Sequence, residues 1–324
     1  MATDGSDAPV RAPANLRGAL YSLLAYGIYS AHDVVVKLLG ATYSPFQIVF
    51  FTMLFGFPVV TVMLMHDRTD GNLRPRHPWW LALRTVAMVI STPAAFYAFS
   101  VLPLAQTYTI LFAAPLLITL LAIPILREPV GWRRGLAVLV GLAGVIIVLR
   151  PGSAPLGAGH LAALAAAITS AFVAVVTRKI GSDERSVVLI IYPMMAMLIT
   201  MACALPFTYR PMPGLHLVGS ASMALASFLG GLFVIFAYRN GNAVVVAPMQ
   251  YSQLIWAVLY GALVFDERPD LVTAIGAAII ILSGIYVVLR EEQIPRSDRP
   301  VQGSPTRYLT GTLPRLGALL RRRH

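Results

Sequence analysis

Ten stretches of this sequence are mostly apolar, each about 20 residues long, and they follow one another with little chain between them. A helix needs roughly 20 apolar residues to cross a bilayer, and inside lipid only helices and closed barrels satisfy the backbone hydrogen bonds. Only 12% of the residues are charged, whereas about 25% are charged in a typical soluble domain. We therefore predict an all-α integral membrane protein with ten transmembrane helices, at about 17–39, 44–65, 79–101, 103–126, 132–149, 156–177, 186–208, 215–237, 243–265 and 270–289.

Two polar tails flank the apolar segments: residues 1–16, and the basic residues 291–324, which we predict to be disordered. The first apolar segment is too long for the core of a signal peptide, so no cleaved targeting sequence is expected. The net charge of +11 does not point to nucleic acid, because the basic residues are distributed by loop. With the N-terminus inside, the inner loops hold ten Lys or Arg residues and the outer loops four. This asymmetry predicts a multi-pass protein of the cytoplasmic membrane with both termini in the cytoplasm.

An internal repeat runs through the chain at an offset of 139 to 141 residues. Each half of the chain then holds five spans, and an odd number turns the second half upside down relative to the first. Inverted repeats are typical of secondary transporters, whose solute site lies near the midplane between the halves. We predict a cytoplasmic tail at 1–16, repeats at 17–152 and 153–290, and a tail at 291–324. The matching positions are Gly18 with Gly159, Ser30-Ala31 with Ser170-Ala171, Tyr97-Ala98-Phe99 with Phe236-Ala237-Tyr238, Glu128 with Glu267, and Gly144-Val145 with Gly284-Ile285.

Three sets of residues carry a resemblance to a known family: Arg127-Glu128-Pro129 with the later Pro151-Gly152, Leu102-Pro103-Leu104-Ala105, and Ala247-Pro248 with Tyr251. In these runs the chain resembles the EamA-type branch of the drug/metabolite transporter superfamily, over about residues 17 to 290. The resemblance implies a ten-helix permease for small organic solutes, with cytoplasmic termini and without ATP. It is similar to a subset that includes riboflavin and S-adenosylmethionine carriers. That subset commonly has an Arg after a Phe-Phe pair in span two, where this chain has Thr52 after Phe50-Phe51.

The first span carries two charges, Asp33 and Lys37, at positions where the second repeat has Val173 and Thr177. A charge at the bilayer centre costs about 2.5–3.5 kcal/mol on insertion scales, so such residues usually face protein or water and have a role. Spaced four apart on one helix face, the two side chains could form an intrahelical ion pair, with Lys37 reaching the outer interface. The alternative hypothesis is that Asp33 binds a proton or a cationic group of the solute during transport.

The ninth span is polar where its counterpart in the first repeat is not. Gln250, Gln253 and Trp256 are spaced three apart, which predicts a polar and aromatic stripe suited to a planar or heteroatom-rich solute. Tyr251 lies beside the stripe, and Pro248 predicts a kink, which membrane helices tolerate where they line a cavity. The alternative is that the glutamines form hydrogen bonds between helices and Trp256 only packs.

Other candidates are weaker. Arg84, in the third span, suits snorkelling to the cytoplasmic side as well as anion binding; Tyr29 and Tyr97 are further candidate contacts. Glu128 and Glu267 each end a span shortly before a proline, which indicates helix-start and hinge residues. Pro115 and Pro248 stand at different distances from these two glutamates, so we expect two kinks at different depths.

Two other classes of function are less well supported than a transporter. A membrane-embedded enzyme would need a nucleophile, a base or a metal cluster, but the six histidines have no ligand spacing. A channel is disfavoured, because no ring of charge is repeated around a pore. We predict a permease that moves a small organic metabolite by alternating access, with no cofactor or metal. The alternatives of metabolite or drug export and of vitamin or cofactor uptake stay open, as does a homodimer.

Overall fold

The computed structural model describes residues 12–65, 73–128, 130–151, 156–291, 306–307 and 310–311. The described chain is helical except for one short antiparallel strand pair, β1 (Thr306–Arg307) with β2 (Thr310–Gly311). The helices are α1 (Ala12–Gly40), α2 (Pro45–Met65), α3 (Pro78–Val101), α4 (Leu104–Leu111), α5 (Ala113–Leu126), α6 (Trp132–Leu149), α7 (Ala158–Ile180), α8 (Ser186–Thr208), α9 (Gly214–Asn240), α10 (Ala243–Val246), the 3₁₀ turn η1 (Ala247–Tyr251), α11 (Ser252–Phe265) and α12 (Leu271–Glu291).

Each of the ten predicted segments is helical, and two of them are divided: the fourth into α4 and α5, the ninth into α10, η1 and α11. Within the described residues, seven helices are long and apolar enough to cross a membrane, with α4 and α5 counted as one. The apolar part of α2, Pro45–Pro58, is shorter. The chain is therefore an all-helical, multi-pass membrane protein.

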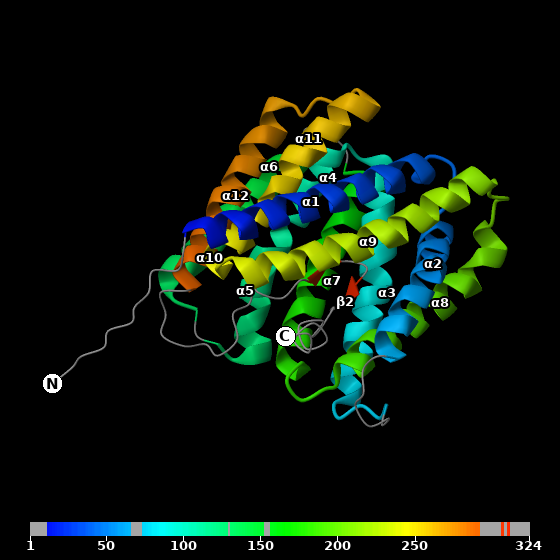
Figure 1. Ribbon diagram of the computed structural model, residues 1–324. Coiled ribbons are helices and arrows are strands. Elements are labelled where there is room, and N and C mark those ends of the chain that lie inside the picture. Colours follow the sequence, from blue (N-terminus) through cyan, green and yellow to red (C-terminus); the bar gives the residue numbers. More distant parts are fainter. Residues whose placement is uncertain are drawn as a thin grey trace.

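Helices that correspond under the sequence repeat pack in corresponding ways. The two most extensive helix pairs are α1 with α9 and α3 with α7, and the repeat relates α1 to α7 and α3 to α9. Two further pairs, α6 with α12 and α2 with α8, join counterparts directly. In Figure 1, α1 and α9 run side by side through the middle of the molecule, with α6 and α12 to one side and α2 and α8 to the other. The first and second halves therefore interlock.

Small residues allow the closest of these contacts. A Cβ on Gly276 would lie 2.9 Å from the carbonyl oxygen of Gly144, so α6 and α12 touch backbone to backbone. A Cβ on Gly18 would lie 2.6 Å from Cα of Gly241, where α1 begins to run along α9. Such packing drives helix association in lipid, where a hydrophobic force between helices is missing.

The fourth and ninth segments break at positions that are equivalent in the repeat. Phe112 separates α4 from α5, and Tyr251 ends η1 directly before α11; these residues are 139 positions apart. Their rings touch, with centroids 5.1 Å apart at 68°. The expectation of two kinks at different depths is therefore wrong. Pro115 and Pro248 lie on opposite sides of the equivalent breaks, because proline is tolerated in the first turn of a helix on either side.

The two broken segments also end alike. Arg127 after α5 and Asp266 after α11 adopt left-handed backbone conformations, with φ of 57° and 53°. The following amide groups, of Glu128 and Glu267, donate to carbonyl groups one and a half turns earlier. This is the hydrogen-bond pattern that closes many helices, and it turns both glutamates back toward the helix bundle.

Candidate solute-binding site

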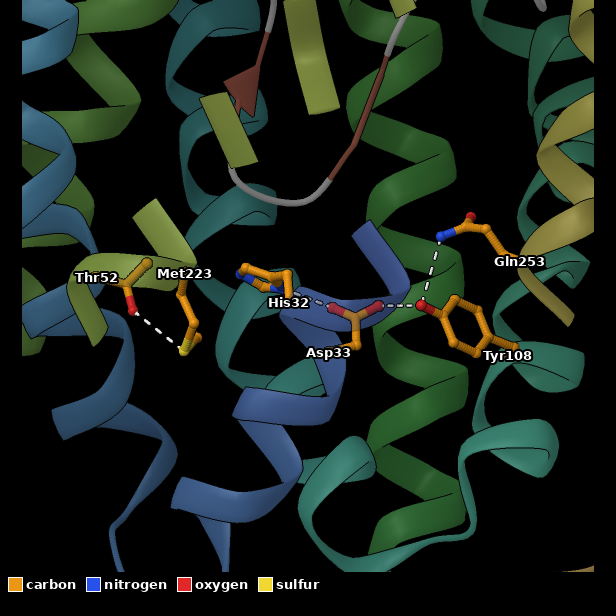
Figure 2. Close-up of polar contacts among 6 residues, drawn as sticks. All are labelled: His32, Asp33, Thr52, Tyr108, Met223 and Gln253. Carbon is orange, nitrogen blue, oxygen red and sulfur yellow. Dashed lines mark hydrogen bonds and ion pairs between the residues drawn. The ribbon is translucent and has the colours of Figure 1, made fainter. Parts of the chain in front are cut away.

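The centre of the molecule holds a buried carboxyl group. Asp33 lies in the last third of α1 and is 6% exposed. Its Oδ1 lies 2.7 Å from Nδ1 of His32, and its Oδ2 accepts a hydrogen bond from the hydroxyl of Tyr108 on α4. His32 and Tyr108 lie on opposite sides of the carboxyl group (Figure 2). A buried charge needs such partners to be tolerated, so both oxygens of Asp33 are held in place.

The second half of the chain contacts Tyr108, the partner of Asp33, through a side chain of α11. Nε2 of Gln253 donates to the Tyr108 hydroxyl at 3.4 Å. Gln253 is 4% exposed and comes from the polar stripe predicted in the ninth span. A chain of polar contacts thus runs from α11 through α4 to α1, and we call the four residues His32, Asp33, Tyr108 and Gln253 the central cluster. It couples side chains of both halves at one point.

Aromatic rings surround the central cluster. The ring of Tyr108 packs against Phe99 at 5.1 Å and Phe112 at 6.0 Å, and the ring of His32 meets the edge of Phe96 at 5.8 Å. The hydroxyl of Thr52 on α2 contacts the sulfur of Met223 on α9 at 4.0 Å, as drawn with the cluster in Figure 2. Apolar and aromatic walls with a few convergent polar groups are typical of small-molecule sites.

Lys37 does not pair with Asp33. Its Nζ lies 2.5 Å from Oε1 of Glu267 and 2.5 Å from the carbonyl oxygen of Leu102, and it stands over the ring of Phe265 at 5.1 Å. Of the two alternatives, the intrahelical pair is not the one that forms, because Lys37 pairs with a carboxylate at the end of another helix. Asp33 and Lys37 belong to two different polar groups.

A second ion pair corresponds to this one in the other half. Arg178, at the end of α7, holds Glu128 in a two-pronged contact, with distances of 3.0 Å and 2.8 Å. The helix-start and hinge roles expected of Glu128 and Glu267 stay predictions. Each binds a cation at the end of the first helix of the opposite half, and Glu267 also accepts from the amide of Leu104 at the start of α4. Both glutamates join the two halves.

Arg84 lies outside the central cluster, and it is buried instead of snorkelling to the cytoplasmic side. It is fully buried, donating from Nε to the hydroxyl of Thr177 at 2.6 Å and from Nη1 to the carbonyl oxygen of Leu189 at 2.9 Å. It joins α3 to α7 and α8. Thr177 is the residue that the repeat places opposite Lys37, so each half uses this position to bind a different polar group.

The remaining predicted residues lie around the centre at various distances from the carboxyl group. Tyr251 is buried, with its hydroxyl against the backbone of Gly284 on α12. Trp256 stacks on Tyr260 at 6.0 Å and packs against Gly27 of α1. Gln250 is half-buried in η1, Tyr97 is half-buried on α3, and the buried Tyr29 packs against Gly230 of α9. Among the ninth-span candidates, Gln253 is the one that we find hydrogen-bonded to the central cluster in the described part of the chain.

Sequence reasoning missed two members of the central cluster. The search for metal-ligand spacing among the histidines leaves His32 without a role, although a histidine beside an aspartate inside a span is itself a signal. Tyr108 is not among the residues singled out from the sequence. Its position one turn before the break at Phe112 could have indicated it, had the break been recognised.

The comparison with known families fits this geometry. The profile of the "EamA-like transporter family" matches residues 16–150 and again residues 157–290. The chain belongs to the EamA-like transporter family. The two matches cover the two halves found from the internal repeat. They show a membrane protein of a transporter family, and they agree with a function other than catalysis.

Relatives in this family carry names of small-molecule transporters. The chain is 25% identical over 285 residues to an S-adenosylmethionine uptake transporter of Rickettsia prowazekii, covering 86% of this chain and 94% of the relative. It is 29% identical over 308 residues to a riboflavin transporter of Vibrio cholerae, covering 88% and 97%. A solved structure matches with a TM-score of 0.58 at 20% identity, covering 86% of this chain and 99% of the other, which shows a likeness of fold alone. The chain is thus a small-molecule transporter of the EamA-like family.

Proposed function

We propose that this protein is a secondary transporter that moves a small organic metabolite across the cytoplasmic membrane by alternating access. In this proposal the ten helical segments all cross the bilayer, as two inverted five-helix repeats with both termini in the cytoplasm. The equivalent breaks at Phe112 and Tyr251, whose rings touch at 5.1 Å, support such a relation between the halves. Two halves that exchange roles give an inward-open and an outward-open state.

The observation that carries the proposal is the chain of contacts from Gln253 through Tyr108 to Asp33. It joins both family repeats across broken helices, and broken helices at the midplane are where transporters of this kind hold their solutes. We propose that the solute binds at the central cluster and that Asp33 takes up a proton or faces a cationic group during the cycle.

The names of the relatives supply the first solutes to test. S-adenosylmethionine and riboflavin both join a flat, nitrogen-rich ring system to a polar chain, and the rings around Tyr108 suit a flat solute. We therefore propose a heteroatom-rich aromatic metabolite as the solute class.

The test is flux of radiolabelled S-adenosylmethionine and riboflavin into proteoliposomes of the purified protein. We expect flux that saturates with solute concentration. Unlabelled solute on the far side should accelerate it, because a carrier loaded with solute changes between its two states faster than an empty one. Asp33→Asn should reduce the flux and change its dependence on pH, whereas Asp183→Asn, on an exposed loop, should leave both unchanged. Flux that rises linearly with concentration would indicate a channel, and unchanged flux and pH dependence in Asp33→Asn would exclude the role given to that carboxyl group.

A further inference from the structure

His32 has one ring nitrogen in use and one that is not. Nδ1 lies 2.7 Å from Asp33, whereas Nε2 is buried and has no hydrogen-bond partner. The whole side chain is 4% exposed. Buried polar atoms in folded proteins nearly always have partners, and an exception needs a reason, such as a bound ligand.

The contacts of Asp33 determine what this nitrogen can do. The Tyr108 hydroxyl donates to Oδ2 of Asp33, so the carboxyl group acts as an acceptor on that side. An ionised carboxylate is an acceptor on both oxygens, and the His32 nitrogen facing Oδ1 must then carry the hydrogen. A neutral imidazole that donates from Nδ1 holds a lone pair on Nε2. In that tautomer the buried Nε2 of His32 is an acceptor that lacks a donor.

Within the described part of the chain, the charged group that contacts the His32 ring is Asp33, through Nδ1. His32 meets the ring edge of Phe96 on α3, and α9 runs antiparallel to α1 with the thioether of Met223 near this level. Lys37, one turn and a half further along α1, is bound to Glu267, and Arg84 is bound to α7 and α8. A solute that reaches this nitrogen would meet it beside the ring of Phe96.

We propose that Nε2 of His32 accepts a hydrogen bond from an N–H or ammonium group of the transported solute. Asp33 is then a positioning residue, which fixes the ring and its tautomer, and Tyr108 and Gln253 hold Asp33. This inference rests on the proposed function and deepens it, because it moves the solute contact from the carboxyl group to the imidazole. The solute class is a nitrogen-rich metabolite with an exposed hydrogen-bond donor.

Two substitutions at His32 separate this role from a structural one. The amide of asparagine takes the place of Nδ1 and can keep the contact with Asp33, while the amide of glutamine reaches the place of Nε2 and can keep an acceptor there. We expect His32→Asn to weaken binding of the transported probe, S-adenosylmethionine or riboflavin, by at least about tenfold, and His32→Gln by about threefold or less. His216→Asn and His216→Gln form the matched control, because His216 Nδ1 also has a short contact, at 2.7 Å to the Tyr43 hydroxyl.

The reverse order, or an equal loss in both His32 variants, would overturn the proposal and leave His32 as a support for Asp33. Should a variant fail to fold, analogues of the probe methylated at one N–H at a time give a second measurement on the wild-type protein. Methylation at one of these positions should raise the Kd about tenfold. If no methylated analogue binds more weakly, the solute donates no hydrogen bond to His32. Wild-type protein that carries neither probe with saturation would refute the proposed function, whereas saturable wild-type flux with the wrong order of variants refutes only this inference.

Discussion

Removing the hydroxyl group of Tyr108 tests whether its hydrogen bond stabilises the carboxyl group of Asp33. Tyr108→Phe deletes the donor to Oδ2 of Asp33 and the acceptor for Gln253, and it keeps the ring, which is 2% exposed and packed at 5.1 Å against Phe99. A hydrogen bond to a charged group contributes about 1.5–3 kcal/mol to stability. We expect Tyr108→Phe to lower the free energy of unfolding by about 2 kcal/mol and to reduce solute flux.

The matched control is Tyr43→Phe. Tyr43 is also buried, at 4% exposure, but its hydroxyl meets the imidazole of His216, at 2.7 Å, and not a carboxyl group. A typical hydrogen bond contributes about 1 kcal/mol, so this variant should lose about half as much stability and keep its flux. Steric trapping in lipid bicelles measures both free energies at one temperature. The reasoning is refuted if Tyr43→Phe costs as much as Tyr108→Phe, or if Tyr108→Phe carries solute at the wild-type rate.

Two further predictions concern the packing and the ion pairs. Gly276→Ala should cost about 1–3 kcal/mol of stability, because its Cβ would lie 2.9 Å from the carbonyl oxygen of Gly144, whereas Gly135→Ala, with nothing within 4 Å, should gain about 0.5–1 kcal/mol; equal effects in steric trapping would contradict this packing. Glu267→Gln should cost about 3 kcal/mol, since Lys37, 12% exposed, loses its counter-ion. Adding Lys37→Met should recover at least half of that loss, and a double-mutant cycle without coupling would mean that the pair contributes nothing.

The positions of the helices could be predicted from the sequence, because an apolar stretch of this length satisfies its backbone hydrogen bonds in lipid by forming a helix. The equivalent breaks were harder. Pro248 marks a kink in the ninth segment, but Pro115 follows the break in the fourth segment and so misplaces it. At the break, Phe112 contacts Tyr251, a residue far away in the sequence. Spacing within one helix cannot indicate such a contact.

The sequence predicts a site residue where the reason lies within one helix. It does not predict the partners that other helices supply. The cost of burying a charge in lipid correctly marked Asp33 as a residue with partners to find. The four-residue spacing offered Lys37 as one possible partner, because an isolated helix favours that pair. The folded chain offers Lys37 a carboxylate from Glu267 and offers Asp33 a hydroxyl from Tyr108. Both choices depend on how the two halves interlock.

Alternating access around the central cluster is tested most directly by thiol labelling at the two ends of the molecule. Phe265 and Leu126 end α11 and α5 at equivalent positions of the repeat. Each is changed to cysteine in a Cys203→Ala background, and reaction with a water-soluble maleimide is followed in proteoliposomes with and without saturating S-adenosylmethionine or riboflavin, whichever is carried. We predict that solute raises the labelling rate at one of these positions and lowers it at the other. Rates that rise together, fall together or stay unchanged while solute is being transported would contradict the account.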